Sequence, residues 1–280
     1  SGGLIDRSKE ISFIFNGKKY NGYKGDTLAS ALLANGVHLI GRSFKYHRPR
    51  GIIAAGVEDA NGKVQLYKDN ITEPNVNVTE VELVEGLRIE SQNCWPSVNF
   101  DVGGINNFLN RFFPAVFYYK TFMWPKSFWY HVYEPFIRKA AGMGKASLDP
   151  DPDRYEHQYE HCDILVVGSG PSGIASALSA AKNGARVILA EDKARFGGSL
   201  LTDNVTIGNK NGDEWVEDSI SELKSMPNVI IKKRSQVFGY YDHNMLVMFE
   251  RCKDHLNNLE PYTPRQRLWY IRAKHVLIST

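Results

Sequence analysis

Hydrophobic and polar positions alternate at the start of the chain in the period of a half-buried strand. Residues 11–15 (Ile-Ser-Phe-Ile-Phe) predict one strand, and residues 18–22 predict a second strand that returns beside it. Asn16 and Gly17 lie between them, and this pair is typical of a two-residue hairpin turn. The chain is therefore expected to open with a β-hairpin.

The spacing of apolar positions then changes to that of a helix. Residues 28–33 predict a short helix, which Asp26 or Thr27 can cap at its start and Gly36 can close after its end. A hairpin followed by a helix is how β-grasp domains begin, so residues 1–100 are expected to form such a domain. Further strands of this domain are expected at residues 63–67 and within residues 76–83.

Residues 101–160 form a different stretch, which is rich in aromatic side chains and interrupted by prolines. We interpret it as a connector that lies against another surface. That surface is either its own chain, or a partner subunit or missing domain. The aromatic residues include Phe108, Phe112, Phe113, Phe117, Tyr118, Tyr119, Phe122, Trp124, Phe128, Trp129, Tyr130, Tyr133 and Phe136.

Residues 161–280 alternate between strand and helix patterns, which indicates an α/β domain of the Rossmann type. The last strand is followed by no closing helix, so we expect the domain to be truncated at its C-terminus. The fold class is thus α+β followed by α/β, with a β meander inserted in the second domain. The expected strands are residues 163–167, 186–190, 229–232 and 275–279, the helices 171–183 and 213–226, and the meander 236–241, 245–250 and 268–272.

Composition narrows the possible functions. The chain has 280 residues, 42% of them hydrophobic and 23% charged, and its net charge of +3 gives no basic field for binding nucleic acid. No apolar run approaches the roughly 20 residues of a membrane span. Its 3 cysteines fit no metal-binding or disulfide pattern. We expect a cytoplasmic protein that contacts neither membrane nor nucleic acid and has no metal ligands of its own.

The motif with the clearest chemistry is Gly168-Ser-Gly-Pro-Ser-Gly173, between a predicted strand and a predicted helix. Gly168 permits a tight turn, Gly170 lets the backbone approach a pyrophosphate, and Gly173 lets the helix lie close to the strand. The amide groups at the start of the helix favour an anion. The motif predicts a dinucleotide-binding loop.

Two later features extend this prediction. Glu191 ends the second strand, where an acidic residue binds the ribose hydroxyls and repels the 2′-phosphate of NADP. Gly197 and Gly198 resemble the second glycine pair of flavoprotein domains, where Ser199 can reach phosphate, although a plain turn would also explain them. The motif is compatible with NAD and with FAD.

Other candidates are less specific. Residues 42–50 form a basic loop around Phe44 and Tyr46. A subunit contact, an anionic-cofactor contact and a solvated loop are all compatible with it, and RNA binding is the least specific interpretation. The sequence contains no recognisable nucleophile–base pair or pair of catalytic carboxylates, so no residue is predicted to be catalytic.

Four segments together resemble a known family. Residues 41–51 (Gly-Arg-Ser-Phe-Lys-Tyr-His-Arg-Pro-Arg-Gly), 91–96, 117–125 and 151–155 are similar, in this order, to the alpha subunit of heterotetrameric sarcosine oxidases. The resemblance extends over the whole chain. These segments are not general features of Rossmann domains.

The resemblance implies a cluster-free, ferredoxin-like β-grasp domain, an NAD-binding domain, and beta, gamma and delta partner subunits. The family's complex carries FAD, FMN and zinc, oxidises sarcosine to glycine with oxygen as acceptor, and delivers the one-carbon unit to tetrahydrofolate. Sarcosine and folate bind elsewhere, so this piece alone is expected to be inactive. The implied NAD-binding residues are Gly168, Gly170, Pro171, Ser172, Gly173, Glu191, Asp192, Lys193, Gly198, Ser199 and Val237.

Relatives that share the first domain suggest alternatives. The ferredoxin-like subunits of opine and proline dehydrogenases, and hydrogen cyanide synthase, include members with cluster-binding cysteines after the position of Arg50, whereas residues 51–60 here contain none. An FAD-binding subunit of an opine, proline or amine dehydrogenase remains an alternative. A non-catalytic scaffold with a structural nucleotide is another.

Overall fold

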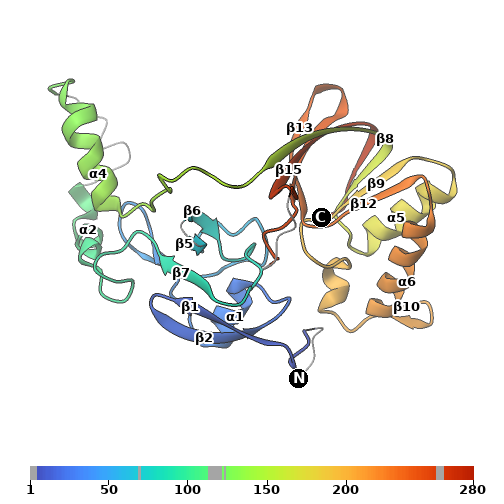
Figure 1. Cartoon of the computed structure of the whole chain (residues 1–280), viewed down its shortest axis with the longest axis horizontal. Helices are drawn as coiled ribbons and strands as arrows, with labels where there is room; N and C mark the ends of the chain where they lie inside the picture. Colours follow the sequence, from blue (N-terminus) through green and yellow to red (C-terminus); the bar gives the residue numbers. More distant parts are fainter. Residues whose placement is uncertain (1–4, 69–70, 113–121, 123, 257–261) are drawn as a thin grey trace. The chain divides into compact units, whose positions relative to one another are not determined.

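A computed structural model describes residues 5–68, 71–112, 122, 124–256 and 262–280 (Figure 1). The chain divides into two compact units, here called the first unit (Ile5–Asp151) and the second unit (Pro152–Thr280). The described residues of the predicted connector as far as Asp151 group with the first unit. Four of its aromatic residues, Phe113, Phe117, Tyr118 and Tyr119, lie outside the described residues.

The first unit is built on a five-stranded sheet in the order β2-β1-β7-β5-β6. Asn16 and Gly17 both have positive φ angles, 51° and 77°, as a tight hairpin turn requires, so the predicted hairpin is confirmed. β7 runs parallel to β1, and the other neighbours are antiparallel. The strands are β1 (Glu10–Phe15), β2 (Lys18–Tyr23), β5 (Lys63–Lys68), β6 (Ile71–Asn77) and β7 (Leu87–Ser91).

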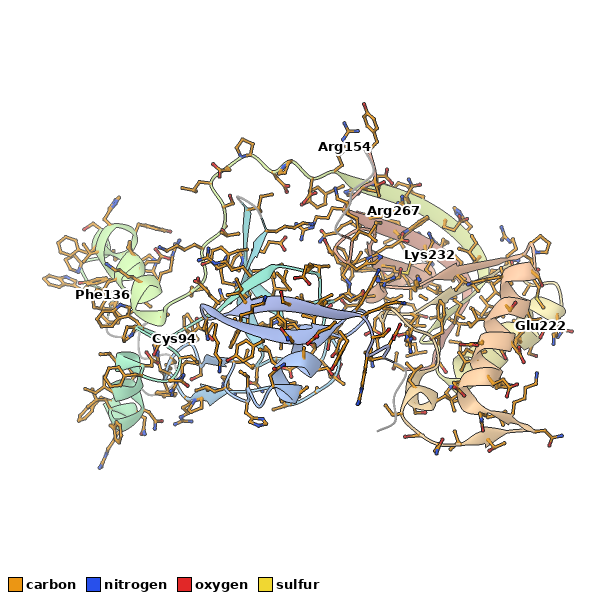
Figure 2. The ribbon with its side chains drawn as sticks, turned by 60° about the horizontal axis from the view of Figure 1, so that its bottom comes forward. Cys94, Phe136, Arg154, Glu222, Lys232 and Arg267 are labelled. Atoms are coloured by element: carbon orange, nitrogen blue, oxygen red, sulfur yellow. The ribbon has the colours of Figure 1, made fainter. Side chains whose placement is uncertain are left out.

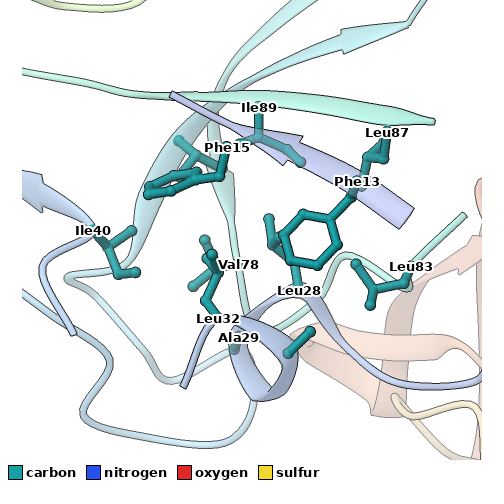
Figure 3. Packing of buried hydrophobic residues seen from close by; sticks show 12 residues of the cluster. Phe13, Phe15, Leu28, Ala29, Leu32, Ile40, Val78, Leu83, Leu87 and Ile89 are labelled. Carbon is teal, nitrogen blue, oxygen red and sulfur yellow. The ribbon is translucent and has the colours of Figure 1, made fainter. Parts of the chain in front are cut away.

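The predicted helix is α1 (Leu28–Ala34), and Thr27 rather than Asp26 caps it by accepting a hydrogen bond from the Ser30 N–H. The helix packs its apolar face under the sheet (Figure 3). Full burial of each large side chain contributes about 1.5–3 kcal/mol. A hairpin, a helix and a strand parallel to the first form the β-grasp arrangement. The fully buried side chains include Phe13, Leu28, Leu32, Ile40 and Ile89.

Short helices replace extended structure after the sheet of the first unit. Gln65 fastens the end of this segment to β5: its side chain donates to the Lys145 carbonyl and accepts from the Lys145 N–H, each at 2.9 Å. Asn93 donates its N–H to the Gly142 carbonyl at 2.8 Å. The helices are η1 (Val102–Gly104), α2 (Ile105–Phe108), η2 (Asn110–Phe112), η3 (Trp129–Tyr133) and α4 (Glu134–Ala141); β3 (Gly41–Arg42) and β4 (Pro49–Arg50) form a small ladder.

The second unit is built on a six-stranded sheet in the order β12-β9-β8-β15-β14-β13. The first four strands are parallel, and β13 and β14 are the antiparallel members of the meander. Helices α5 and α6 pack on one face of the parallel strands (Figure 1). The elements are β8 (Tyr155–Val167), α5 (Pro171–Lys182), β9 (Val187–Ala190), β10 (Thr206–Ile207), β11 (Lys210–Asn211), α6 (Gly212–Ser225), β12 (Val229–Lys232), β13 (Ser235–Tyr241), β14 (Met245–Arg251) and β15 (Gln266–Ile278).

Three expectations about strands were wrong in detail. The segments 268–272 and 275–279 are one strand, β15, which pairs in parallel with β8 from Gln266 opposite Tyr155 to Ile278 opposite Val167. β8 accordingly begins eight positions earlier than the strand predicted at 163. The strand expected within 76–83 ends at Asn77, and the central strand β7 was not predicted.

Candidate dinucleotide-binding site

The glycine motif joins the carboxyl end of β8 to the start of α5. Gly170 caps the helix with extended backbone angles (φ −67°, ψ 179°), and no side chain bonds to the first free N–H groups. Pro171 occupies the first turn, which contains no acidic residue. The positive end of the helix dipole is thus open to an anion.

The three glycines of the motif serve different purposes. Gly168 has a φ angle of 97°, which favours glycine, and a Cβ atom on Gly173 would lie 2.1 Å from the Gly168 carbonyl oxygen. These two positions are fixed by the protein's own backbone. A Cβ atom on Gly170 would meet nothing nearer than 3.9 Å, the Ser279 carbonyl oxygen. Gly170 therefore leaves open space beside the helix start, where a ligand would lie.

Glu191 follows β9 directly and is nearly buried, with 6% of its surface exposed. One carboxylate oxygen accepts the Ser169 N–H at 2.9 Å and the Ser169 hydroxyl at 2.5 Å. The other accepts the Lys193 N–H at 3.0 Å. Glu191 thus ties the end of β9 to the glycine loop, a role that the sequence did not predict. Its contact with a ribose stays a prediction.

Asp192 lies beside Glu191 and shares a hydrogen bond with it. Burial, together with this hydrogen bond, raises the pKa of Asp192 to about 6. Burial alone would raise the pKa of Glu191 as well, but hydrogen bonds from Asp192, Ser169 and the Lys193 N–H lower it. Glu191 is therefore the first of the two to ionise, and Asp192 ionises as the pH rises through about 6.

The second glycine pair lies against the first loop. Gly198 has a φ angle of 55°, and a Cβ atom there would lie 2.9 Å from the Gly170 Cα atom. The Gly197 N–H donates to the Ser169 carbonyl at 3.0 Å. Ser199 is exposed in the short helix η4 (Gly198–Leu201) that follows. The structure thus brings the two predicted phosphate loops together.

The start of β13 lies beside the residues that follow β9. The Ser235 N–H donates to the Glu191 carbonyl at 2.7 Å, and the Arg234 N–H donates to the Lys193 carbonyl at 3.0 Å. Val237 follows two residues later, where the pairing of β13 with β14 shifts. These bonds bring the strand that carries Val237 to the acidic end of β9.

Ser279, which follows β15, contacts the first turn of α5 and was not predicted from the sequence. Its hydroxyl oxygen lies 2.5 Å from that of Ser172, and its N–H donates to the Val167 carbonyl at 2.7 Å. The general rule that ligands lie at the carboxyl ends of parallel strands would have identified it, once β15 was recognised as the neighbour of β8. The candidate site therefore includes a residue more than a hundred positions from the glycine motif.

Two family models match parts of the chain. Residues 8–94 match the 2Fe-2S iron-sulfur cluster binding domain, and residues 163–234 match the FAD dependent oxidoreductase family. The fold thus combines a ferredoxin-like domain with a dinucleotide-binding domain of the FAD oxidoreductase kind.

Comparison with individual proteins identifies relatives that match nearly the whole chain. The chain is 50% identical over 278 residues to "Sarcosine oxidase subunit alpha" of Rhizobium meliloti (strain 1021), covering 99% of this chain and 28% of that protein. It is 30% identical to the protein of the same name from Corynebacterium sp. (strain P-1), covering 99% of this chain and 24% of that protein. The chain therefore spans about a quarter of the length of these relatives. The resemblance to sarcosine oxidase alpha subunits is confirmed over nearly the whole chain.

A solved structure shares the fold. The L-proline dehydrogenase of P. horikoshii superposes with a TM-score of 0.60 at 18% sequence identity, covering 99% of this chain and 42% of that one.

The residues of the ferredoxin-like domain do not fit a cluster held by four cysteines. Residues 8–94 contain one cysteine, Cys94, which is labelled in Figure 2. Burial of its thiol, together with the nearby Asp101 carboxylate, raises the pKa of Cys94 to about 11. In the loop after Arg50, the Asp59 carboxylate accepts the N–H groups of Ile53, Ala54, Asn61 and Gly62 at 2.8–3.1 Å. A buried carboxylate thus organises this loop.

The described residues also bear on metal binding and on membrane insertion. No group of three or more His, Cys, Asp or Glu side chains there is arranged to hold a metal ion. None of the described helices is long and apolar enough to cross a membrane.

Proposed function

We propose that the second unit binds NAD, with the pyrophosphate at the start of α5 and the adenosine ribose at Glu191. The observation that carries this proposal is the open space at Gly170, beside a helix start whose first N–H groups have no side-chain cap. Free N–H groups there are suited to bind the pyrophosphate oxygens, and Glu191 is suited to accept ribose hydroxyls. Asp192, Lys193, Ser199 and Val237 complete the proposed site.

FAD is the second candidate. It shares the adenosine diphosphate half with NAD, and the match of residues 163–234 to the FAD dependent oxidoreductase family favours it. A bound flavin would supply a hydride acceptor. The described residues of the site would then hold the adenosine end, as they would for NAD.

We further propose that the chain acts within an alpha subunit of a tetrahydrofolate-linked complex that oxidises sarcosine to glycine. The name shared by its relatives supports this assignment. Beta, gamma and delta subunits would complete the complex, and FAD, FMN, zinc and the folate site would lie outside this chain. No residue of the chain is assigned a catalytic role.

The test is to identify the nucleotide that the native protein carries. The complex is purified without added nucleotide, denatured, and the released small molecules are identified by mass. One NAD per chain is the expected result. FAD recovered in proportion to this chain, beyond any FAD held by partner subunits, would support the second candidate, and recovery of neither nucleotide would overturn the assignment.

A further inference from the structure

We propose that the surface formed by residues 41–50 and 95–112, here called the aromatic-basic face, docks a partner subunit that presents apolar side chains bordered by carboxylates. This inference rests on the proposed function only in assuming that the chain acts within a complex. It gives a role to the basic loop of residues 42–50, which has no part in the proposed dinucleotide site.

The two segments of the face are fastened to each other. The Arg42 guanidinium donates twice to the Val98 carbonyl, at 2.9 and 2.7 Å. The His47 ring nitrogen lies 2.7 Å from the Asp101 carboxylate, and both side chains are almost fully buried (3% and 0% exposed). A Cβ atom on Gly103 would lie 2.4 Å from the His47 ring, so the backbone packs directly on it. The face is therefore one built surface rather than two loose loops.

A further bond connects the exposed parts of the face. The Arg48 guanidinium donates to the Asn107 side chain at 2.7 Å, next to Phe108 in α2. Phe108 is 86% exposed and Phe112 is 75% exposed. Exposed apolar side chains at this density mark interaction surfaces. The apolar members of the face are Phe44, Trp95, Phe100, Val102, Ile105, Phe108, Leu109 and Phe112.

The charges of the face indicate the chemistry of its partner. Asp101 is the one acidic residue in the two segments. Its carboxylate is hydrogen-bonded to the His47 ring and to the N–H groups of Trp95 and Gly103. The exposed charges are therefore all positive, so carboxylates of a partner complement them. The basic residues of the two segments are Arg42, Lys45, Arg48, Arg50 and Arg111.

A protein partner fits this composition better than a lipid surface. Cores of protein interfaces are enriched in aromatic residues and Arg and depleted in Lys, and the two segments contain four Arg and one Lys. α2, the α-helix of the face, has four residues, which is too short to form the amphipathic helix that lies in a membrane surface. The buried His47–Asp101 pair also holds a defined shape, as a specific interface requires.

The test uses the full-length alpha subunit with its partner subunits. Replacing both Phe108 and Phe112 with Ser is expected to weaken assembly roughly tenfold or more, measured by sedimentation at several concentrations. Arg111→Glu is expected to slow association and to reduce its dependence on salt. The matched control is Leu148→Ser, an exposed apolar side chain of the same unit outside the face. Thermal unfolding of each isolated subunit checks that it is folded.

Several results would overturn the inference. Assembly unchanged in both variants would do so. A second contradicting result is that the wild-type subunit binds vesicles of phosphatidylserine and phosphatidylcholine, while the variants lose this binding and still assemble. That result would indicate a membrane-binding surface. Self-association of the isolated subunit that the variants abolish would indicate a second copy instead. The nucleotide content of the same preparations is measured separately, so failure of the NAD assignment is distinguishable from failure of the docking assignment.

Discussion

The Glu191 carboxylate lies 2.5 Å from the Ser169 hydroxyl oxygen and 2.9 Å from the Ser169 nitrogen, so the acidic end of β9 and the glycine loop form one hydrogen-bonded unit. In a dinucleotide, the pyrophosphate and the ribose are separated by a short covalent link. A fixed distance between the groups that bind them therefore preorganises the site. Changes at Glu191 are expected to affect both halves of the site.

The first prediction is a preference for NAD over NADP. The anionic Glu191 would repel a 2′-phosphate, so we expect the affinity for NAD to exceed that for NADP by roughly tenfold or more. Glu191→Gln should narrow this ratio and weaken NAD binding, while Glu217→Gln, an exposed acid on α6, serves as the control. Calorimetric titration of the intact complex measures both affinities. Equal binding of the two nucleotides would refute the prediction.

The second prediction concerns pH. The pKa of Asp192 is raised to about 6 in the folded protein, from an ordinary value of 3.8, so folding favours its protonated form. Its contribution to stability is complete below pH 3.8 and is lost as the pH rises through about 6. Asn mimics the protonated acid. Asp192→Asn should therefore unfold at a higher temperature than the wild type at pH 7–8, with a difference that shrinks towards pH 4. A difference independent of pH would contradict this account.

The third prediction concerns the Asp59 loop. Burial alone would raise the pKa of Asp59, but the four backbone N–H groups lower it below 3.8. Its stabilising effect is therefore present above pH 3.8 and is lost as the pH falls further. Asp59→Asn turns an amide group towards these donors and should cost about 1–3 kcal/mol of unfolding free energy. Urea unfolding at pH 7 measures this loss; Glu58→Gln, one residue away, is the control. An unchanged midpoint for Asp59→Asn would show that the loop does not depend on the carboxylate.

The fourth prediction is that residues 1–100 hold no iron–sulfur cluster. Such clusters use thiolate ligands, and this part of the chain contains only Cys94. Anaerobically purified protein should therefore contain no acid-labile sulfide attributable to this domain. Stoichiometric sulfide, lost on Cys94→Ser, would overturn the prediction.

The elements that sequence predicted best are those with a local signal. The hairpin at Asn16–Gly17 and the start of α5 depend on turn and capping residues, which neighbouring positions specify. β7 was not predicted, although Leu87 and Ile89 alternate with polar residues. The strand has only five residues and follows the turn at Gly86, so the alternating pattern is too short to identify it. The long pairing of β8 with β15 was also not predicted. The first half of β8 is polar, so it lacks the apolar pattern of a buried strand, and its pairing joins residues that are far apart in the chain.

The candidate site shows the same division. The glycine motif and Glu191 could be identified from residue type and spacing. The bond between Glu191 and Ser169, and the approach of Ser279 to Ser172, depend on how the strands are ordered in the sheet. A single sequence does not specify that order.

The central claim, that the glycine loop binds a dinucleotide, is tested most directly at Gly170. A Cβ atom there meets open space in the protein but would occupy the space assigned to the pyrophosphate, whereas on Gly173 it would strike the Gly168 carbonyl. Gly170→Ala should therefore keep the wild-type unfolding temperature, and Gly173→Ala should lower it. The decisive measurement is the dissociation constant for NAD of Gly170→Ala against the wild type, by titration of nucleotide-depleted complex. We predict a loss of roughly tenfold or more in affinity with stability unchanged; unchanged affinity in a folded Gly170→Ala protein would contradict the account.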